Sequence, residues 1–215
     1  MKNILKINPE KPDINLLQKA AGILKDGGII GYPTETIYGL GADVFNDEAV
    51  EKIYRLKGRD KNKPILIIAA SLDQVKELIV SFPEKAVVLT QEFWPGPLTI
   101  VFDASPRLNK SITGKQQTVG IRIPNNQICL ELIKFAGVPI TSTSANLTGN
   151  KNPVTAREVA ENFGDRLNLI LDGGQSNSAT PSTVISVINN GIKIIREGAI
   201  SKFSIMKILG NKIDE

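Results

Sequence analysis

The chain has 215 residues, of which 41% are hydrophobic and 22% charged, with a formal net charge of +4 at pH 7. This composition is typical of a soluble globular protein, and no apolar run approaches the ~18 residues that a membrane span needs. Since there is no histidine and only one cysteine, the sequence excludes Ser-His-Asp and Cys-His catalysis, histidine-ligated zinc, cysteine-cluster metal sites and an internal disulfide.

The N-terminal segment has no apolar signal-peptide core followed by a small-residue cleavage site. The lone Cys129 fits a reducing compartment, so we expect a cytoplasmic protein that is not associated with a membrane. The mildly basic charge balance is compatible with a nucleotide or RNA ligand and identifies neither.

The first half of the chain alternates between strand and helix patterns. Asp13 is a predicted N-cap, and the apolar residues behind it recur at helical spacing. The run 65–70 is continuously apolar, which fits a strand buried on both faces. In chain order we expect a strand at 4–7, a helix at 14–24, strands at 29–32 and 38–44, a helix at 47–56, a strand at 65–70, a short helix after 71, a helix at 84–93 and a strand at 98–102.

The second half begins with a polar segment, 104–117, that is predicted to be an irregular loop. Thr155 and Glu158 form a capping-box pattern, and Asn189-Asn190-Gly191 is a hairpin signal. Strands are expected at 118–123, 138–141, 169–171, 183–188 and 192–196, and helices at 127–136, 155–163 and 202–209. Strand and helix alternate for most of the length, which indicates an α/β fold with a mixed sheet.

Five cations alternate with other residues between positions 55 and 63. If this segment is extended, its alternate side chains line one face, and a row of cations with this spacing suits a run of phosphates. Gly58 and Pro64 disfavour a helix through it. The alternative interpretation is a solvated basic loop. The cations are Arg55, Lys57, Arg59, Lys61 and Lys63.

Short polar groups also follow several predicted strands, a position where functional residues tend to lie. Each group alone is explained as a helix cap, a solvated residue or a surface ion pair. Together they suit a polyanionic ligand: Arg122 could hold a carboxylate, and Asn146 with the hydroxyls could read sugar or substrate heteroatoms. Without histidine, catalysis would rest on positioning and charge stabilisation, as nucleotidyl transfer allows. The groups are Thr34 to Thr36, Thr118 with Arg122, Ser142 to Asn146, Ser182 with Thr183, and Arg196.

Eight segments in a fixed order resemble the YrdC family of threonylcarbamoyl-AMP synthases. The resemblance covers roughly residues 15–200, most of the chain, and the order of the segments makes it more specific than any one of them. The sequence departs from the pattern at Asp60, where many relatives have proline. The segments are PTETIYGL at 33–40, KGR at 57–59, KP at 63–64, WPGPLT at 94–99, TVGIRIP at 118–124, SAN at 144–146, STV at 182–184 and IREGAI at 195–200.

The resemblance implies an enzyme, a nucleotidyltransferase that condenses L-threonine, bicarbonate and ATP into threonylcarbamoyl-adenylate and pyrophosphate. It also implies a twisted α/β sheet with flanking helices around a large, open, basic cavity. The product serves the N6-threonylcarbamoyl modification of adenosine 37 in tRNA. The implied partners are therefore tRNA and separate transferase proteins that use the adenylate. Mg²⁺ is expected to arrive with ATP, and no resident metal site is expected.

The resemblance also assigns roles to residues. Lys57 and Arg59 are the expected catalytic residues, because they would stabilise the charge that develops at the phosphate. ATP is expected to contact Lys57, Arg59, Lys61, Lys63, Ser144, Asn146 and Arg196. L-threonine is expected to contact Thr34, Thr118, Arg122, Ser142 and Ser182.

Longer relatives carry a second C-terminal domain, and this sequence resembles the short form. We therefore expect one domain over residues 1–215, with a core at about 15–200 and no second C-terminal domain. Two other functions remain open. One is a carbamoyl-transfer module of the kind found in larger hydrogenase-maturation proteins. The other is a non-catalytic RNA-binding or ribosome-maturation protein of the same fold.

Overall fold

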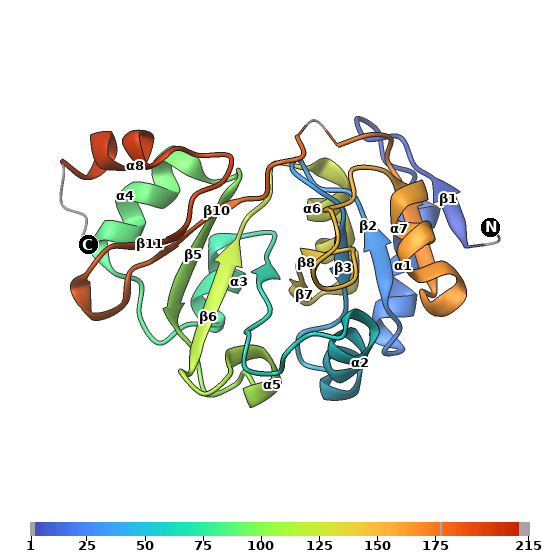
Figure 1. Cartoon of the computed structure of the whole chain (residues 1–215), viewed down its shortest axis with the longest axis horizontal. Helices are drawn as coiled ribbons and strands as arrows, with labels where there is room; N and C mark the ends of the chain where they lie inside the picture. The colour runs from blue at the N-terminus through green and yellow to red at the C-terminus, as the bar shows by residue number, and fades with distance from the viewer. Residues whose placement is uncertain (1–2, 177, 211–215) are drawn as a thin grey trace.

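The strands of the computed structural model lie in two mixed sheets (Figure 1). The structure describes residues 3–176 and 178–210. Parallel and antiparallel pairs occur in both sheets. The first sheet has the order β1 (Ile4–Lys6), β9 (Leu169–Asp172), β2 (Ile30–Tyr32), β3 (Gly39–Gly41), β8 (Thr143–Ser144). The second has the order β11 (Lys193–Arg196), β10 (Thr183–Ser186), β5 (Leu98–Asp103), β6 (Thr118–Arg122), β4 (Ile67–Ile68), β7 (Ile140–Thr141).

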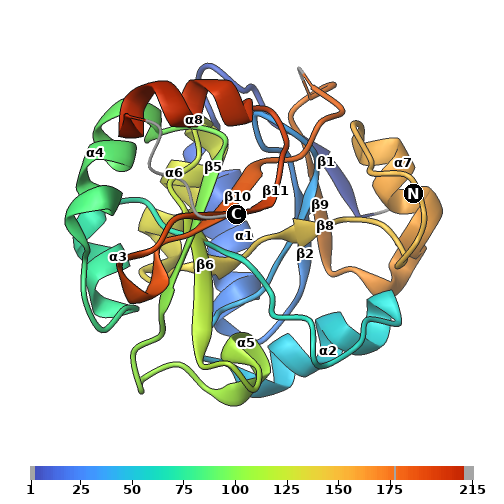
Figure 2. The same cartoon turned by 60° about the vertical axis from the view of Figure 1, so that its left-hand side comes forward.

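Helices flank both sheets. Figure 2 shows α4 and α8 to one side of the second sheet and α7 on the opposite side of the molecule. None of the helices in the described ranges is long and apolar enough to cross a membrane. The helices are α1 (Ile14–Lys25), α2 (Asp47–Lys57), α3 (Leu72–Glu77), α4 (Glu84–Phe93), α5 (Lys110–Thr113), α6 (Gln127–Ala136), α7 (Ala156–Phe163) and α8 (Lys202–Leu209), with short 3-10 turns at Gly164–Arg166 and Ile188–Asn190.

Local sequence explains where the helices begin. The Asp13 carboxylate accepts hydrogen bonds from the backbone N–H groups of Asn15 and Leu16, which opens α1. The capping box expected at Thr155 and Glu158 is present at the start of α7. The helices α4 and α6 have the bounds that the sequence predicts.

The two sheets share a hydrophobic core. The larger cluster of buried side chains includes Leu40 and Ile170 from the first sheet together with Ile100 and Ile121 from the second. A second cluster packs α1 and α6 against the first sheet. Because side chains from both sheets bury one another, each sheet supports the position of the other.

The α/β class is confirmed, and the expected sheet is divided in two. The apolar run 65–70 pairs only at Ile67–Ile68, and the extended stretch 38–44 pairs in a ladder only at Gly39–Gly41. Helix α2 and the loop after it separate β3 from β4 in the chain, and the two strands pair into different sheets. The hairpin expected near the C-terminal end is confirmed, with β10 antiparallel to β11.

Two local expectations are wrong. The cations at 55–63 do not form an extended row, because α2 continues through Lys57, and Gly58 then ends the helix with φ 59°. A turn follows, in which the Lys63 N–H donates to the Asp60 carbonyl. The segment 104–117 is not entirely irregular, because Asn109 caps the short helix α5 through the Ser111 N–H.

Candidate functional site

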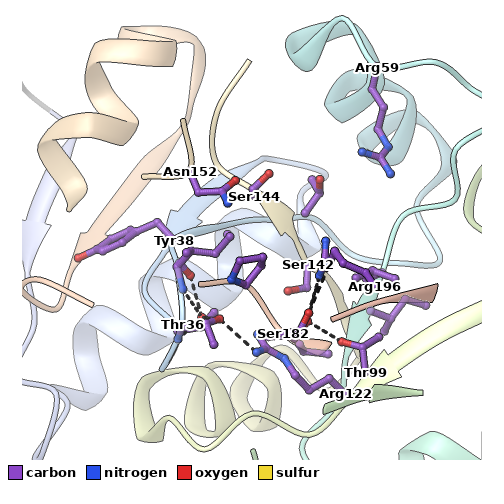
Figure 3. A pocket seen from close by; sticks show the side chains of 18 residues that line it. Thr36, Tyr38, Arg59, Thr99, Arg122, Ser142, Ser144, Asn152, Ser182 and Arg196 are labelled. Atoms are coloured by element: carbon purple, nitrogen blue, oxygen red, sulfur yellow. Dashed lines mark hydrogen bonds between the residues drawn. The ribbon is translucent and has the colours of Figure 1, made fainter. Parts of the chain in front are cut away.

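A pocket of about 130 Å³ lies between the two sheets (Figure 3). Its walls come from the turn between β2 and β3, from β8 and the residues before it, and from strands β4, β5 and β6. Arg59 reaches it from the loop after α2, and Ser182 and Arg196 from the β10–β11 hairpin. Segments far apart in sequence therefore build one site. The polar residues that line it are Thr34, Thr36, Tyr38, Arg59, Thr99, Arg122, Ser142, Thr143, Ser144, Asn152, Ser182 and Arg196.

Three arginines converge on this pocket. Arg59 donates from Nε to the Lys63 carbonyl at 3.0 Å and from Nη2 to the Pro64 carbonyl at 2.8 Å. Arg196 donates from Nε and Nη2 to the Ser182 carbonyl at 3.3 and 2.8 Å. Burial lowers the pKa of both, and repulsion from Arg122 and Arg59 lowers that of Arg196 further. The convergence of positive charge favours an anionic ligand.

The third arginine, Arg122, is held by the turn between β2 and β3. Its Nη1 lies 3.3 Å from Glu35 Oε1 and 3.3 Å from Thr36 Oγ1. The Thr34 hydroxyl donates to the Ile37 carbonyl at 2.7 Å and lies 3.0 Å from Thr36 Oγ1. Since arginine can only donate, the hydrogen bonds run in one direction from Arg122 through Thr36 and Thr34 to the Ile37 carbonyl.

Lys57 is buried, with 3% of its surface exposed, and does not line the pocket. Its Nζ donates to the Ser144 carbonyl, to the Asn146 carbonyl at 2.6 Å and to Asn146 Oδ1 at 3.3 Å. Burial, together with the nearby Arg59 charge, lowers the pKa of Lys57 to about 7. Lys57 therefore ties the end of α2 to the chain at 144–146, which carries the pocket residue Ser144.

The structure brings most of the predicted site residues together. Thr34, Arg59, Arg122, Ser142, Ser144, Ser182 and Arg196 line the pocket. Lys57 and Asn146 lie buried behind its wall and contact each other.

Three predicted residues lie outside this pocket. Thr118 is at the opposite end of β6 from Arg122 and pairs with Asp103. Lys61 is exposed and forms an ion pair of 2.6 Å with Glu51. Lys63 is exposed on the loop before β4, where its carbonyl receives a hydrogen bond from Arg59.

Sequence reasoning from single residues missed Tyr38, Thr99 and Asn152, which also line the pocket. Thr99 interrupts an apolar run from Leu98 to Phe102, which is one signal that marks it in the sequence. Its hydroxyl lies 2.9 Å from Ser182 Oγ. Tyr38 lies within the segment PTETIYGL and Thr99 at the end of WPGPLT. Nothing in the sequence around Asn152 marks that residue.

The described ranges contain no group of three or more histidine, cysteine, aspartate or glutamate side chains that could hold a metal ion. No carboxylate is among the lining residues, and the neighbouring Glu35 is paired with Arg122. The site is therefore built from cations, hydroxyls and amides. Such a site binds an anionic substrate and stabilises charge on it.

A known protein family matches most of this chain. The model of the Sua5/YciO/YrdC family, described as telomere recombination, matches residues 22–198. The chain therefore belongs to the Sua5/YciO/YrdC family.

Several relatives in this family are threonylcarbamoyl-AMP synthases. The enzyme of Pyrococcus abyssi is 39% identical over 191 residues, which are 89% of this chain and 56% of that protein. The enzyme of Bacillus subtilis is 38% identical, over 90% of this chain and 56% of that protein. The enzyme of Vibrio vulnificus is 35% identical, over 80% of this chain and 93% of that protein. The chain thus spans little more than half the length of the first two relatives.

Solved structures agree with the sequence relatives. The crystal structure of Pyrococcus abyssi Sua5 complexed with L-threonine superposes with a TM-score of 0.94 and 36% identity, covering 98% of this chain and 62% of that one. The crystal structure of Escherichia coli YciO gives a TM-score of 0.85 and 26% identity, covering 94% of this chain and 98% of that one.

Proposed function

We propose that this protein is a threonylcarbamoyl-AMP synthase, which converts L-threonine, bicarbonate and ATP into threonylcarbamoyl-adenylate and pyrophosphate. The observation that carries the proposal is the convergence of Arg59, Arg122 and Arg196 on one pocket that is also lined by hydroxyl groups. Family membership and the names of the relatives support it. The fold similarity to a Sua5 structure with bound L-threonine adds further support.

The pocket offers different chemistry at its two ends. L-threonine would bind at the end formed by Thr34, Arg122, Ser142 and Ser182, where the guanidinium can pair with its carboxylate. The volume of about 130 Å³ is below the ~300 Å³ of pockets for drug-sized ligands, so ATP would extend beyond this pocket.

ATP would lie along the side that carries Arg59, Arg196 and Ser144, with Lys57 and Asn146 shaping the wall behind Ser144. Lys61 and Lys63 would contribute to phosphate binding from the loop after Arg59. Thr118 lies at the end of β6 opposite Arg122, outside the pocket. A contact between Thr118 and bound L-threonine would therefore have to form beyond the pocket.

Two steps account for the product. The threonine amine condenses with bicarbonate to give a carbamate and water. A carbamate oxygen then forms a bond to the α-phosphorus of ATP, the bond from that phosphorus to its bridging oxygen breaks, and pyrophosphate leaves with the electron pair. Arg59 would stabilise the charge that develops on the phosphates. Lys57 would help to position the phosphates through its hydrogen bond to Ser144. Mg²⁺ would be held by the ATP phosphates, since the pocket lining supplies no carboxylate ligand.

The adenylate would then pass to separate transferase proteins that modify tRNA. We also propose that the protein contacts tRNA and is located in the cytoplasm. One domain over residues 1–215 without a second C-terminal domain stays a prediction.

The test is to incubate the purified protein with ATP, Mg²⁺, bicarbonate and L-threonine in the absence of RNA. We expect pyrophosphate release that depends on threonine, and a product with the mass of threonylcarbamoyl-adenylate. Arg59→Ala is the matched variant and should lose the product while remaining folded. RNA binding by the wild-type protein without turnover of ATP and threonine would instead support the non-catalytic function.

A further inference from the structure

The three arginines of the pocket differ in their charge partners. Arg122 forms an ion pair with Glu35, whereas Arg59 and Arg196, within residues 3–176 and 178–210, donate only to neutral carbonyl and hydroxyl oxygens. The side chains of Arg122 and Glu35 are only 6% and 15% exposed, so solvent screens their interaction weakly. The pocket therefore has one compensated arginine, Arg122, and two uncompensated ones, Arg59 and Arg196. Arg196 adjoins the Arg122 end, because it donates to the carbonyl and hydroxyl oxygens of Ser182.

The contacts of Arg122 leave one edge of its guanidinium open. Glu35 and Thr36 both take Nη1, and no residue in the described part of the chain accepts a hydrogen bond from Nε or Nη2. The Nε–Nη2 edge is the geometry that pairs with a carboxylate through two parallel hydrogen bonds. Glu35 thus restrains Arg122 and compensates its charge without occupying the edge that a substrate would use.

The carboxylate of Glu35 is itself only partly satisfied. Its Oε2 is buried and has no hydrogen-bond partner among the described residues, and Oε1 has the single partner Arg122. Among the described residues, the Glu35 carboxylate therefore pairs with Arg122 alone. A free amino acid carries an α-ammonium group as well as a carboxylate, and three unopposed arginines would repel that ammonium group.

We propose that Glu35 makes this end of the pocket selective for a zwitterionic amino acid. Arg122 takes the carboxylate, and the negative charge of Glu35 lowers the electrostatic cost of placing the α-ammonium group beside the arginines. Glu35 is thus a specificity-determining residue that acts through charge and through the position of Arg122. This inference rests on the proposed function, because it takes L-threonine as the ligand of the Arg122 end.

The experiment compares two ligands by isothermal titration calorimetry. L-threonine carries the ammonium group, and 3-hydroxybutyrate keeps the carboxylate and hydroxyl but lacks that group. The wild-type protein should prefer L-threonine, and Glu35→Gln, which removes the charge and keeps the shape, should reduce this preference about tenfold or more. If Glu35→Gln does not fold, Glu35→Met supplies a second neutral side chain of similar length for the same comparison.

Three variants separate the charge effect from a general structural effect. Thr36→Val removes the other partner of Arg122 Nη1 without changing charge, so both ligands should weaken alike. Glu35→Asp keeps the charge and should keep the preference. Glu77→Gln is the matched control, because it breaks an exposed Arg–Glu pair of similar length, 3.2 Å, with Arg107, and it should change nothing.

The outcomes distinguish the two proposals. A wild-type preference for threonine that persists in Glu35→Gln, or that Thr36→Val reduces equally, overturns the role of Glu35 and leaves the proposed function intact. A wild-type protein that binds neither ligand overturns both. Loss of the preference in the neutral Glu35 variants alone supports the inference.

Discussion

Lys57 and Arg59 belong to one short motif, yet the structure gives them different surroundings. Lys57 is buried and donates to two backbone carbonyls and one side-chain amide, whereas Arg59 is half-buried and lines the pocket. The first is positioned to support the architecture of the site, and the second is positioned to touch a ligand. Mutation should therefore separate stability from activity at these two positions.

We expect Lys57→Met to lower the free energy of unfolding by about 2 kcal/mol, because the buried carbonyls of Ser144 and Asn146 lose a donor. For a chain of this length that corresponds to a fall in Tm of about 4–8 °C. Arg59→Ala should leave Tm within about 2 °C and reduce adenylate formation about a hundredfold or more, as the loss of a charge-stabilising donor does in other enzymes. Thermal melts followed by circular dichroism and a pyrophosphate assay would measure both. A stable Lys57→Met protein would contradict the structural role.

At the scale of elements, the β10–β11 hairpin and the segment after it position Ser182 and Arg196. Gly198 makes this packing possible, because a Cβ built there would lie 2.2 Å from the Pro181 carbonyl oxygen and 2.6 Å from the Ser182 carbonyl carbon. Both atoms are backbone, so they cannot rotate away. The hairpin must shift if position 198 carries any side chain.

We therefore expect Gly198→Ala to destabilise the protein by about 3 kcal/mol and to weaken ligand binding through displacement of Ser182. Gly22→Ala is the control, because a Cβ at this position of α1 would meet no atom within 4 Å. That variant should stabilise the protein by about 0.5–1 kcal/mol through helix propensity. Urea denaturation measures both changes. Equal stability of the two variants would show that the hairpin tolerates a side chain at position 198.

The sequence predicted most elements because their signals are local. Caps such as Asp13 and Thr155, apolar periodicity and Gly-containing stops are read from neighbouring residues, and the structure has them where expected. The division into two sheets could not be predicted in this way. It depends on pairings such as β1 with β9, which join residues far apart in the sequence.

In the candidate site, too, local signals predicted some features and the three-dimensional arrangement determined the rest. Thr34, Arg122 and Ser182 were recognisable as polar residues beside apolar strands, and the structure places all three on the pocket. The alternating cations from 55 to 63 were misread, because period-two spacing indicates a common face only if the backbone is extended. The αL cap at Gly58 leaves Lys57 on the helix and Arg59 on the loop that follows. The two side chains, only two residues apart, therefore lie in different environments.

At the scale of the whole molecule, the shared core predicts one cooperative unfolding transition. The larger cluster joins Leu40 and Ile170 of the first sheet to Ile100 and Phe102 of the second. Separation of the sheets would expose these side chains on both, which disfavours a state with one sheet folded.

Trp94 tests this expectation, because it is the only tryptophan in the chain. It lies at the end of α4, next to β5, and its Nε1 donates to the Leu98 carbonyl at 2.7 Å. Its fluorescence therefore reports on the second sheet, whereas circular dichroism reports on the whole chain. The two signals should give coincident urea transitions with the same midpoint. A separate fluorescence transition would show that the sheets unfold independently.

The place of β9 in the first sheet has a consequence for synthesis on the ribosome. This strand lies between β1 and β2, and it pairs in parallel with both. The N-terminal strand therefore has no neighbour in its sheet until residues 169–172 have emerged. Until then Ile4 and Leu5, and the edge of β2, have exposed backbone hydrogen-bonding groups, which is a condition that invites pairing with other chains. We therefore expect the nascent chain to be the form of this protein that depends most on chaperones.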